Sequence, residues 1–336
     1  MSSSIKKICF YARGKDEKPF ELLDYYSNDI KIFRELGYEV IFCYDASNLP
    51  KDCDLYYIWW WTSGIIPLIK CRLWGKKNIT IGNLHYSDPS TQGYFNRPTH
   101  IRFFIRYCLR NSQMQLATAK IEYDDIVKLK ASNPRLVYHC IDENKYNYVA
   151  AESRENIILT LTQLTKVNIE RKKVVEIIRA FKIFAEKFPD YRLFIAGNTE
   201  DNGFPYIEKL VNDLELNDKI KFVGRVSDEE KINLYHRAKV YVQPSDFEGF
   251  GMAIAESMLC GTPVVTSRAG AVPEVAGDMA IYVAPNSPEE IADGITKLIS
   301  NPELYSKLSK EGSERIRTKF SYEIRKSAIK EILESY

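Results

Sequence analysis

The most informative segment of this chain runs from residue 243 to residue 261 and reads QPSDFEGFGMAIAESMLCG. A strand pattern ends near Gln243, a loop with glycines at 249 and 251 follows, and a helical pattern then continues to Gly261. The first amides of such a helix have no partner inside it, and its dipole favours negative charge there. The segment therefore predicts an anion site at which glycine lets the backbone approach a phosphate or a sugar.

Two carboxylates bracket this glycine loop. Glu248 precedes the helix. Glu256 stands eight residues after Glu248, within the helix and near the end of its second turn. A carboxylate can accept two hydrogen bonds, which suits the vicinal hydroxyls of a ribose or a hexose. Two glutamates at this spacing are more often solvated charges beside a turn, so the interpretation depends on the complete string around them.

Short apolar runs alternate with amphipathic stretches on both sides of the segment. Because helical patterns separate the strands, we expect parallel pairing and a doubly wound α/β sheet in each half. A polar stretch at 142–155 divides the chain, and residues 287–336 have the pattern of amphipathic helices. We predict domains at 1–150 and 151–315 and a C-terminal helix at 316–336 that could cross back to the first domain. Strands are expected at 7–12, 39–44, 55–61, 78–82, 135–141, 156–161, 191–196, 219–223, 240–243, 263–266 and 280–283.

Composition is that of an ordinary globular protein. The 336 residues suit about two domains, and 45% are apolar and 27% charged. A net charge of +2 gives no global field for nucleic-acid binding, so no nucleic-acid partner is expected. The 7 Cys and 4 His lack the close paired spacing of a disulfide framework or a zinc site. The longest uncharged run, 55–69, is shorter than the roughly 17–25 residues of a membrane helix, and we expect a cytoplasmic protein.

The stretch from Glu248 to Glu256, together with the GTPVV at 261–265 and the GAVPEV at 270–275, resembles the Glu-x7-Glu signature of retaining GT-B glycosyltransferases. The most similar family is glycosyltransferase family 4. Residues 194–197 and 222–226 resemble that family's base-binding region. The resemblance implies the GT-B architecture, in which two Rossmann-like domains with doubly wound parallel sheets face a central cleft. The N-terminal domain would bind the acceptor and the C-terminal domain the nucleotide sugar.

The same resemblance implies roles for individual residues. Glu248, His85 and Lys172 would be catalytic: Glu248 would hold the donor hexose, His85 would lie near that sugar, and Lys172 would neutralise the diphosphate. Glu256 would bind the ribose, and Gly14 would lie on the acceptor side. The full set of donor-binding residues implied is Gly249, Phe250, Gly251, Met252, Ala253, Glu256, Gln163, Gly197, Gly224, Arg225 and Val226.

The implied reaction moves a hexose, with retention, from a UDP- or GDP-linked donor to a carbohydrate or lipid-linked acceptor, with no metal and no other cofactor. Charge would grow on the departing diphosphate, and the helix amides with Lys172 would oppose it. Two other classes stay open, a sugar phosphorylase of the same fold and a non-catalytic subunit. The non-catalytic subunit is considered because Gln163 replaces an arginine of the family pattern. Two further departures from that pattern are Tyr86 in place of an acidic residue and Lys173 in place of a glycine.

Charge compensation for Gln163 could come from elsewhere in the sequence. Gln163 can donate a hydrogen bond but carries no charge. Arg171 and Arg268 are the two candidates to replace the missing arginine.

The aromatic run Trp59-Trp60-Trp61 is a second feature of the first half. Strand alternation would place Trp59 and Trp61 on one buried face. The run ends at the carboxyl edge of the predicted sheet, where such folds bind ligands. Trp61 is therefore also a candidate to stack on an acceptor sugar.

A cationic stripe follows at 100–110. Its arginines stand at i, i+4 and i+8 beside three apolar residues: Arg102, Arg106 and Arg110 beside Phe103, Ile105 and Leu109. A solvated helix face is the simpler interpretation. The alternative is peripheral contact with an anionic membrane on its cytosolic face.

Overall fold

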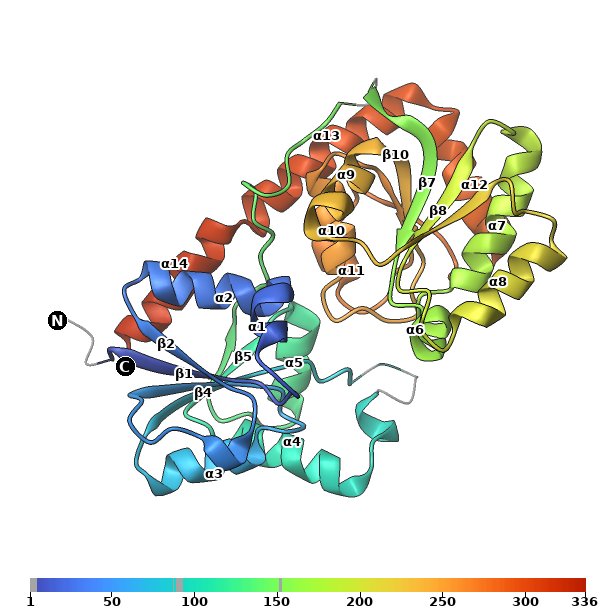
Figure 1. The fold of residues 1–336 in the computed structure, drawn as a ribbon. Coiled ribbons are helices and arrows are strands. Elements are labelled where there is room, and N and C mark those ends of the chain that lie inside the picture. The colour runs from blue at the N-terminus through green and yellow to red at the C-terminus, as the bar shows by residue number, and fades with distance from the viewer. Residues whose placement is uncertain (1–4, 87, 89–92, 151–152) are drawn as a thin grey trace. The chain divides into compact units, whose positions relative to one another are not determined.

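The computed structural model describes residues 5–86, 88, 93–150 and 153–336. The chain divides into two compact units, one formed by Met1–Asp142 with Phe320–Tyr336 and the other by Glu143–Lys319. Each unit contains one six-stranded sheet with helices on both faces (Figure 1). The prediction of two doubly wound, Rossmann-like α/β units is confirmed. The acceptor and donor domains predicted at 1–150, 151–315 and 316–336 stay a prediction, and residues 151 and 152 of the predicted linker lie outside the described residues.

The first sheet has the strand order β2-β1-β3-β4-β5-β6, with parallel pairing throughout. The order reverses between β1 and β3, and ligands of open α/β sheets bind at the carboxyl ends of the strands beside such a point. The strands are β1 (Lys7–Tyr11), β2 (Glu39–Cys43), β3 (Leu55–Trp59), β4 (Lys77–Ile81), β5 (Met114–Ala117) and β6 (Pro134–Leu136).

Strand β5 is not predicted by the sequence pattern. Its four residues include the buried polar residue Gln115, which interrupts the apolar run. The Gln115 side chain donates to the Ser112 carbonyl (2.8 Å) and accepts from the Asn133 amide (2.8 Å). The buried amide is therefore satisfied only by loops that the fold brings beside it.

Two helical layers cover the first sheet. Because strand residues alternate between faces, Phe10 and Tyr57 pack in one core with helices α1, α2 and α14, and Cys9 and Ile58 pack in the other with α3, α4 and α5. The helices are α1 (Lys18–Leu22), α2 (Asp24–Glu35), α3 (Ile65–Leu73), α4 (Thr99–Asn111), α5 (Lys120–Lys128) and α14 (Tyr322–Glu334), with short 3-10 turns at η1 (Ala46–Asn48) and η2 (Tyr94–Asn96).

A buried ion pair holds the C-terminal helix α14 in the first unit. The Arg325 guanidinium donates to both carboxylate oxygens of Asp29 on α2, at 2.6 and 2.9 Å. It also donates to the carbonyls of Val137 and Tyr138 (2.9 and 2.5 Å), and the Tyr57 hydroxyl donates to Asp29 (2.8 Å). The first unit is thus built from both ends of the chain.

The tryptophan run differs from the expected alternation. Strand β3 ends at Trp59, and the positive φ of Trp60 (72°) turns the backbone. Trp59 and Trp61 consequently enter opposite cores of the unit. The Trp61 ring is 2% exposed, and its Nε1 donates to Thr80 Oγ1 (3.2 Å). The prediction that Trp61 stacks on an acceptor sugar is therefore wrong, because core side chains cover the ring.

The second sheet has the order β12-β11-β10-β7-β8-β9 and is again parallel. Helices α7, α8 and α12 cover one face, and α9, α10 and α11 lie on the other (Figure 1). The strands are β7 (Glu155–Leu161), β8 (Arg192–Ala196), β9 (Ile220–Gly224), β10 (Ala238–Gln243), β11 (Val264–Thr266) and β12 (Ile281–Tyr282). The helices are α6 (Lys166–Arg171), α7 (Val174–Lys187), α8 (Phe204–Asp213), α9 (Asp228–Arg237), α10 (Met252–Leu259), α11 (Val272–Ala276), α12 (Pro288–Ile299) and α13 (Pro302–Lys319).

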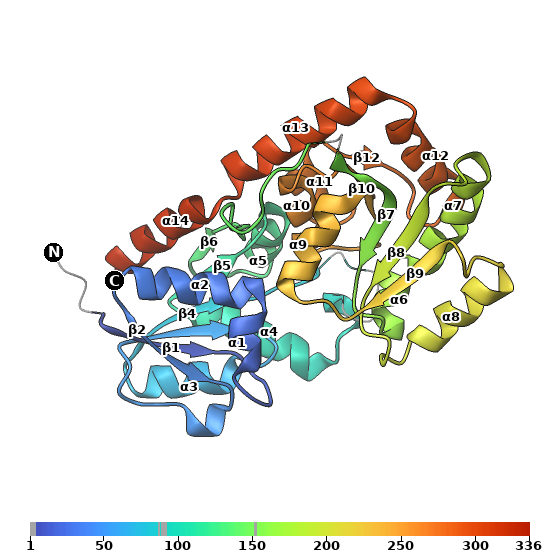
Figure 2. The same cartoon turned by 45° about the horizontal axis from the view of Figure 1, so that its top comes forward.

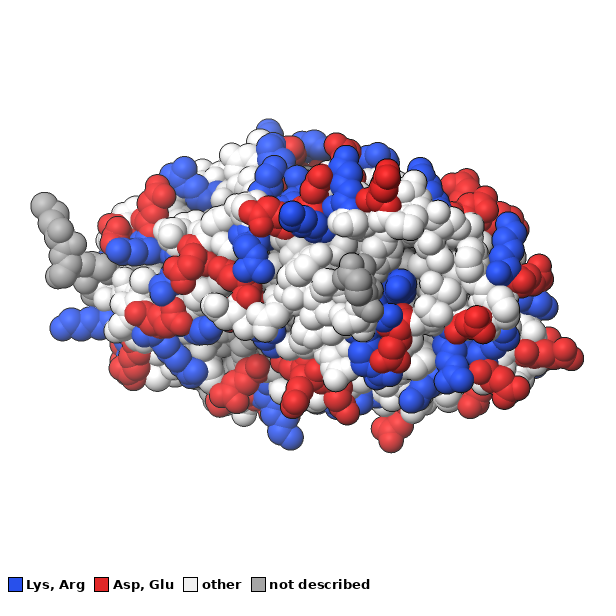
Figure 3. Space-filling view, turned by 90° about the horizontal axis from the view of Figure 1, so that it is seen from above, with Lys and Arg blue, Asp and Glu red and all other residues white. Residues whose placement is uncertain are grey.

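Surface charge is mixed. Figure 3 shows basic and acidic side chains interspersed over the face in view, as the net charge of +2 leads one to expect. Within the described residues, every helix is too short or too polar to cross a lipid bilayer.

Candidate functional site

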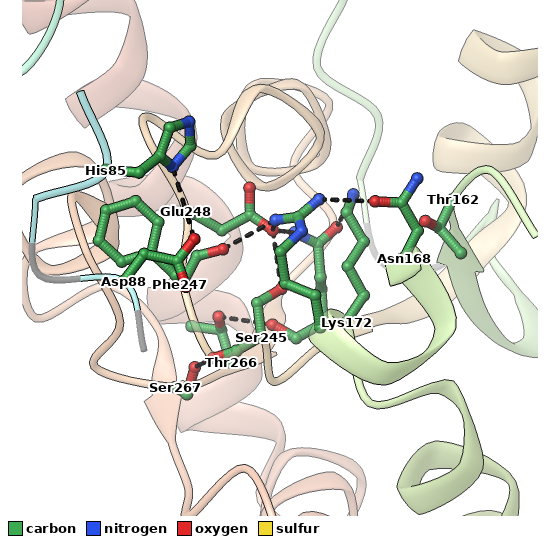
Figure 4. A network of polar contacts seen from close by, with 12 residues as sticks. His85, Asp88, Thr162, Asn168, Lys172, Ser245, Phe247, Glu248, Thr266 and Ser267 are labelled. Carbon is green, nitrogen blue, oxygen red and sulfur yellow. Dashed lines mark hydrogen bonds and ion pairs between the residues drawn. The ribbon is translucent and has the colours of Figure 1, made fainter. Parts of the chain in front are cut away.

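Glu248 lies in the loop between β10 and α10 of the second unit, and its carboxylate is buried. Three donors converge on its Oε1 atom: Ser245 Oγ at 2.7 Å, Gln243 Nε2 at 2.8 Å and Arg171 Nη1 at 3.1 Å. Figure 4 shows Glu248 among these polar groups, with Ser245 and Lys172 close by. This network holds the carboxylate in one orientation.

Electrostatics keep this buried carboxylate ionised. Burial raises the pKa of Glu248, but the charges of Lys172 and Arg171 and the hydrogen bonds from Ser245 and Arg171 outweigh burial, so the pKa lies below its ordinary value. Burial lowers the pKa of Lys172, and Glu248 partly restores it. Lys172 Nζ also donates to Gln243 Oε1 (3.4 Å). The predicted residues Glu248 and Lys172 therefore belong to one charged cluster.

The loop geometry requires glycine at two positions. Gly251 precedes α10 with a φ of 92°, a left-handed conformation that costs a non-glycine residue about 1–2 kcal/mol. Gly270 also has positive φ (56°), and a Cβ there would lie 2.1 Å from the Glu248 carbonyl oxygen. That oxygen accepts from the Ala271 amide (2.9 Å). The predicted glycine loop is thus a tight turn packed against a second loop.

The anion site that the sequence predicts lies at the start of α10, and it stays a prediction. The predicted contacts Gly249, Phe250, Gly251, Met252 and Ala253 span the end of the loop and the first residues of this eight-residue helix. Phe250 is buried, and its role in the fold is packing. The dipole and the first amides of a helix generally favour a phosphate at such an end.

Glu256 lies on α10 and is held by a different set of partners. Its Oε2 accepts from the Tyr235 hydroxyl (2.9 Å), and its Oε1 lies 3.4 Å from Lys231 Nζ. Both partners come from α9. Glu256 is buried like Glu248, and the hydroxyl and the ammonium group together fix the position of its carboxylate.

Four other predicted donor residues line one pocket of about 460 Å³ in the second unit. They are Gln163, Gly197, Arg225 and Val226, at the carboxyl ends of β7, β8 and β9. Gly197 has a packing reason as well, since a Cβ there would lie 2.1 Å from the Thr162 carbonyl oxygen. Gly224 has a φ of 83°, a left-handed conformation that favours glycine, and directly precedes Arg225. The pocket is large enough for a nucleoside fragment.

Two arginines are the predicted replacements for the charge that Gln163 lacks, and the structure distinguishes them. Arg171 bonds to Glu248 and to the Phe247 carbonyl (2.8 Å) and so belongs to the cluster. Arg268 instead stacks on the Tyr282 ring at 4.1 Å. Ser245 and Gln243 are partners of Glu248 that the sequence pattern does not predict. The Ser-x-x-Glu spacing could have pointed to Ser245, although the bond here joins two side chains and not the side-chain and backbone groups of a capping box.

The structure places the remaining predicted residues in the first unit. Gly14 follows β1 in a pocket of about 660 Å³. His85 follows β4 with a φ of 50°, and its Nδ1 lies 3.8 Å from the Asp88 carboxylate (Figure 4). The buried Glu122 carboxyl accepts from the Leu84 amide (2.9 Å) and fixes the loop beside His85.

The described part of the chain contains no group of three or more His, Cys, Asp or Glu side chains arranged to hold a metal. Metal independence stays a prediction, because it concerns the reaction and not the resting site.

Comparison with known proteins gives a consistent result. Residues 143–315 match the model of the family "Glycosyl transferases group 1". The mannosylfructose-phosphate synthase of Agrobacterium fabrum is 27% identical over 234 residues, which cover 63% of this chain and 51% of that protein. The alignment thus spans about half of that relative's length. The O-antigen chain mannosyltransferase RfbU of Salmonella typhimurium is 24% identical over 300 residues, with 82% and 81% coverage.

Solved structures share the fold over nearly the whole chain. The Anabaena protein HepE in complex with UDP and glucose superimposes with a TM-score of 0.80 at 17% identity, covering 98% of this chain and 100% of that chain. Sucrose-phosphate synthase from Thermosynechococcus elongatus has the same TM-score at 18% identity, covering 98% of both chains.

Proposed function

Since the chain belongs to the glycosyl transferases of group 1, we propose that it transfers a hexose, with retention of configuration, from a nucleotide-sugar donor to a carbohydrate or lipid-linked acceptor. The observation that carries this proposal is the buried, ionised Glu248 at the N-terminal end of α10, in a cluster with Lys172 and Arg171. A carboxylate that accepts sugar hydroxyls beside cations that attract phosphate suits a sugar diphosphate.

The proposed roles follow from charge. The bond between the sugar's anomeric carbon and the β-phosphate oxygen breaks, and its electron pair stays on the departing diphosphate. Lys172, Arg171 and the α10 amides stabilise that charge. The acceptor oxygen forms the new bond from the same face, and its proton passes to the departing phosphate. Glu248 positions the hexose, and Glu256 takes the ribose.

The donor's nucleotide belongs in the pocket of Gln163, Gly197, Arg225 and Val226. UDP and GDP are the two candidates, and the structural neighbour in complex with UDP makes UDP the first to test. We assign the charge compensation of the missing family arginine to Arg171. The proposed reaction needs no metal, because three sources of positive potential already face the diphosphate. Activity should therefore survive chelation with EDTA.

The proposed compartment is the cytoplasm. All seven cysteines are buried free thiols, and proteins of reducing compartments keep cysteines in that form. Nucleotide sugars made in the same compartment would reach the site directly.

Calorimetry and activity assays on one pair of variants test the proposal. Wild-type protein should bind UDP-glucose or a GDP-linked hexose, and Glu248→Gln should lower kcat/KM by about 100-fold, because the hexose loses its positioning group. Glu170→Gln, an exposed carboxylate on the neighbouring α6, is the matched control and should behave as wild type. Absence of binding heat with every nucleotide sugar, or full activity in Glu248→Gln, would contradict the proposal.

A further inference from the structure

The pocket beside Gly14 in the first unit is basic. It lies at the carboxyl ends of β1 and β2 and the start of α3, beside the point where the strand order reverses. Its volume is about 660 Å³, and its charged lining residues are Arg13, Lys15, Lys70 and Asp45. Three cations thus face one carboxylate.

The Asp45 carboxylate already accepts hydrogen bonds within the protein. Asp45 accepts from the Ser47 amide (2.9 Å) and the Ser47 hydroxyl (2.6 Å) and thereby caps η1. Lys70 Nζ donates to the carbonyls of Ala46 (2.6 Å) and Ser47 (3.3 Å), which orients the ammonium toward the pocket rim. An ammonium has three donors, so one stays available to a ligand. The pocket therefore favours an anionic group.

An exposed apolar ridge continues from this pocket along α3. Ile66, Ile69 and Leu73 stand at i, i+3 and i+7 and are 55%, 38% and 79% exposed. The opposite side of α3 is buried through Leu68 and Cys71. Ile66 and the pocket's Lys70 lie on the same helix within four residues, so ridge and pocket form one continuous surface.

Helix α4 packs beside α3. Helices α3 and α4 cover the same face of the sheet (Figures 1 and 2), and Arg72 on α3 donates to the carbonyl and side chain of Asn111 (3.1 and 2.6 Å). Two apolar members of the stripe predicted on α4 are not on the surface, because Ile105 and Leu109 are buried in the core. Phe103 on the same helix is 58% exposed.

We propose that the first unit binds an amphiphilic acceptor with an anionic head, a lipid phosphate in a membrane: the α3 ridge enters the bilayer interface, and the Arg13, Lys15 and Lys70 pocket takes the phosphate. This inference rests on the proposed function, since it names the class of acceptor. Exposed apolar side chains flanked by cations match the apolar interior and the negative surface of an anionic bilayer. A soluble sugar would leave the ridge without a role.

Vesicle sedimentation of the full chain at low salt tests the proposal. Wild type should sediment with phosphatidylcholine vesicles that contain phosphatidic acid and much less with phosphatidylcholine alone. Ile69→Glu combined with Leu73→Glu should abolish sedimentation. Ile324→Glu, at an apolar position on α14 that is 44% exposed and lies on the other face of the sheet, is the matched control and should keep it.

A second pair of variants tests the pocket. Arg13→Gln should lower vesicle partitioning about fivefold, because one cation near an anionic surface contributes about that factor to membrane binding. Arg317→Gln, an exposed arginine on α13, should lower it much less. The side chains changed are exposed, so thermal unfolding should match that of wild type.

Binding of vesicles and of inorganic phosphate together distinguishes a lipid acceptor from a soluble one. If vesicles fail to bind while inorganic phosphate binds wild type but not Arg13→Gln, the acceptor is a soluble phosphate and the lipid proposal is overturned. Equal vesicle binding by the ridge double variant also overturns it. Titration of UDP-glucose into that variant separates the two proposals, because the donor site in the second unit should be intact even when the membrane surface is lost.

Discussion

At the scale of single residues, Glu122 carries a carboxyl group that titrates near neutral pH. Burial raises its pKa from 4.5 to about 8, although the amides of Leu84 and Thr118 donate to it (2.9 Å each). The Thr118 hydroxyl also donates to Glu122 Oε2 (3.1 Å) and favours the ionised form, but burial outweighs these hydrogen bonds.

The raised pKa of Glu122 makes the free energy of unfolding depend on pH. Between pH 4.5 and about 8 the unfolded chain has lost this proton and the folded chain retains it. The contribution of Glu122 to the free energy of unfolding is therefore complete below pH 4.5 and falls as pH rises to about 8. Urea denaturation across this window should show a flatter pH profile for Glu122→Gln than for wild type. Identical slopes would mean that Glu122 is ionised in the folded protein.

Lys173 occupies a position that suits glycine. Its φ is 56°, and its Nζ pairs with Asp246 at 2.5 Å. Lys173→Ala loses the ion pair and keeps the backbone strain, whereas Lys173→Gly loses the ion pair and relieves the strain. Thermal or urea unfolding should therefore find Lys173→Gly more stable than Lys173→Ala by about 1 kcal/mol. The reverse order would show that this backbone position carries no strain.

At the scale of elements, the loop before α10 depends on the loop before α11. Gly270→Ala would combine a positive φ with a Cβ 2.1 Å from the Glu248 carbonyl oxygen. Gly37→Ala has a positive φ of 88° but open space around the Cβ, so it isolates the backbone cost of about 1–2 kcal/mol. Urea unfolding should place Gly270→Ala below Gly37→Ala in stability, and kcat/KM should fall only in Gly270→Ala. Equal effects would argue against coupling between the two loops.

At the scale of the whole molecule, the buried Arg325–Asp29 pair joins the two ends of the first unit. Arg325→Ala leaves the Asp29 carboxylate buried without its counter-ion, which should cost about 3–5 kcal/mol in the free energy of unfolding. Lys326→Ala removes the neighbouring, more exposed pair with Glu35 (2.6 Å) and should cost less than about 1 kcal/mol. Urea denaturation compares the two, and similar losses would show that α14 is held by apolar packing alone.

The strands and helices could be predicted largely from local patterns. Eleven of the twelve strands named above lie within the expected ranges or within a residue or two of them, because apolar runs and glycine stops act over a few residues. Strand β5 could not be predicted, since the partners of its buried Gln115 come from neighbouring loops. The expected alternation fails at Trp61, because the positive φ of Trp60 places Trp59 and Trp61 in opposite cores.

The sequence alone determined the alternation of strands and helices and the glycine loop flanked by Glu248 and Glu256, because each depends on residues close together in the chain. Tertiary structure decided which distant groups meet. Arg171, rather than Arg268, contacts Glu248 across 77 positions, and Arg325 reaches Asp29 across 296. Such contacts depend on strand order and on which sheet face each helix covers, and no local pattern encodes either.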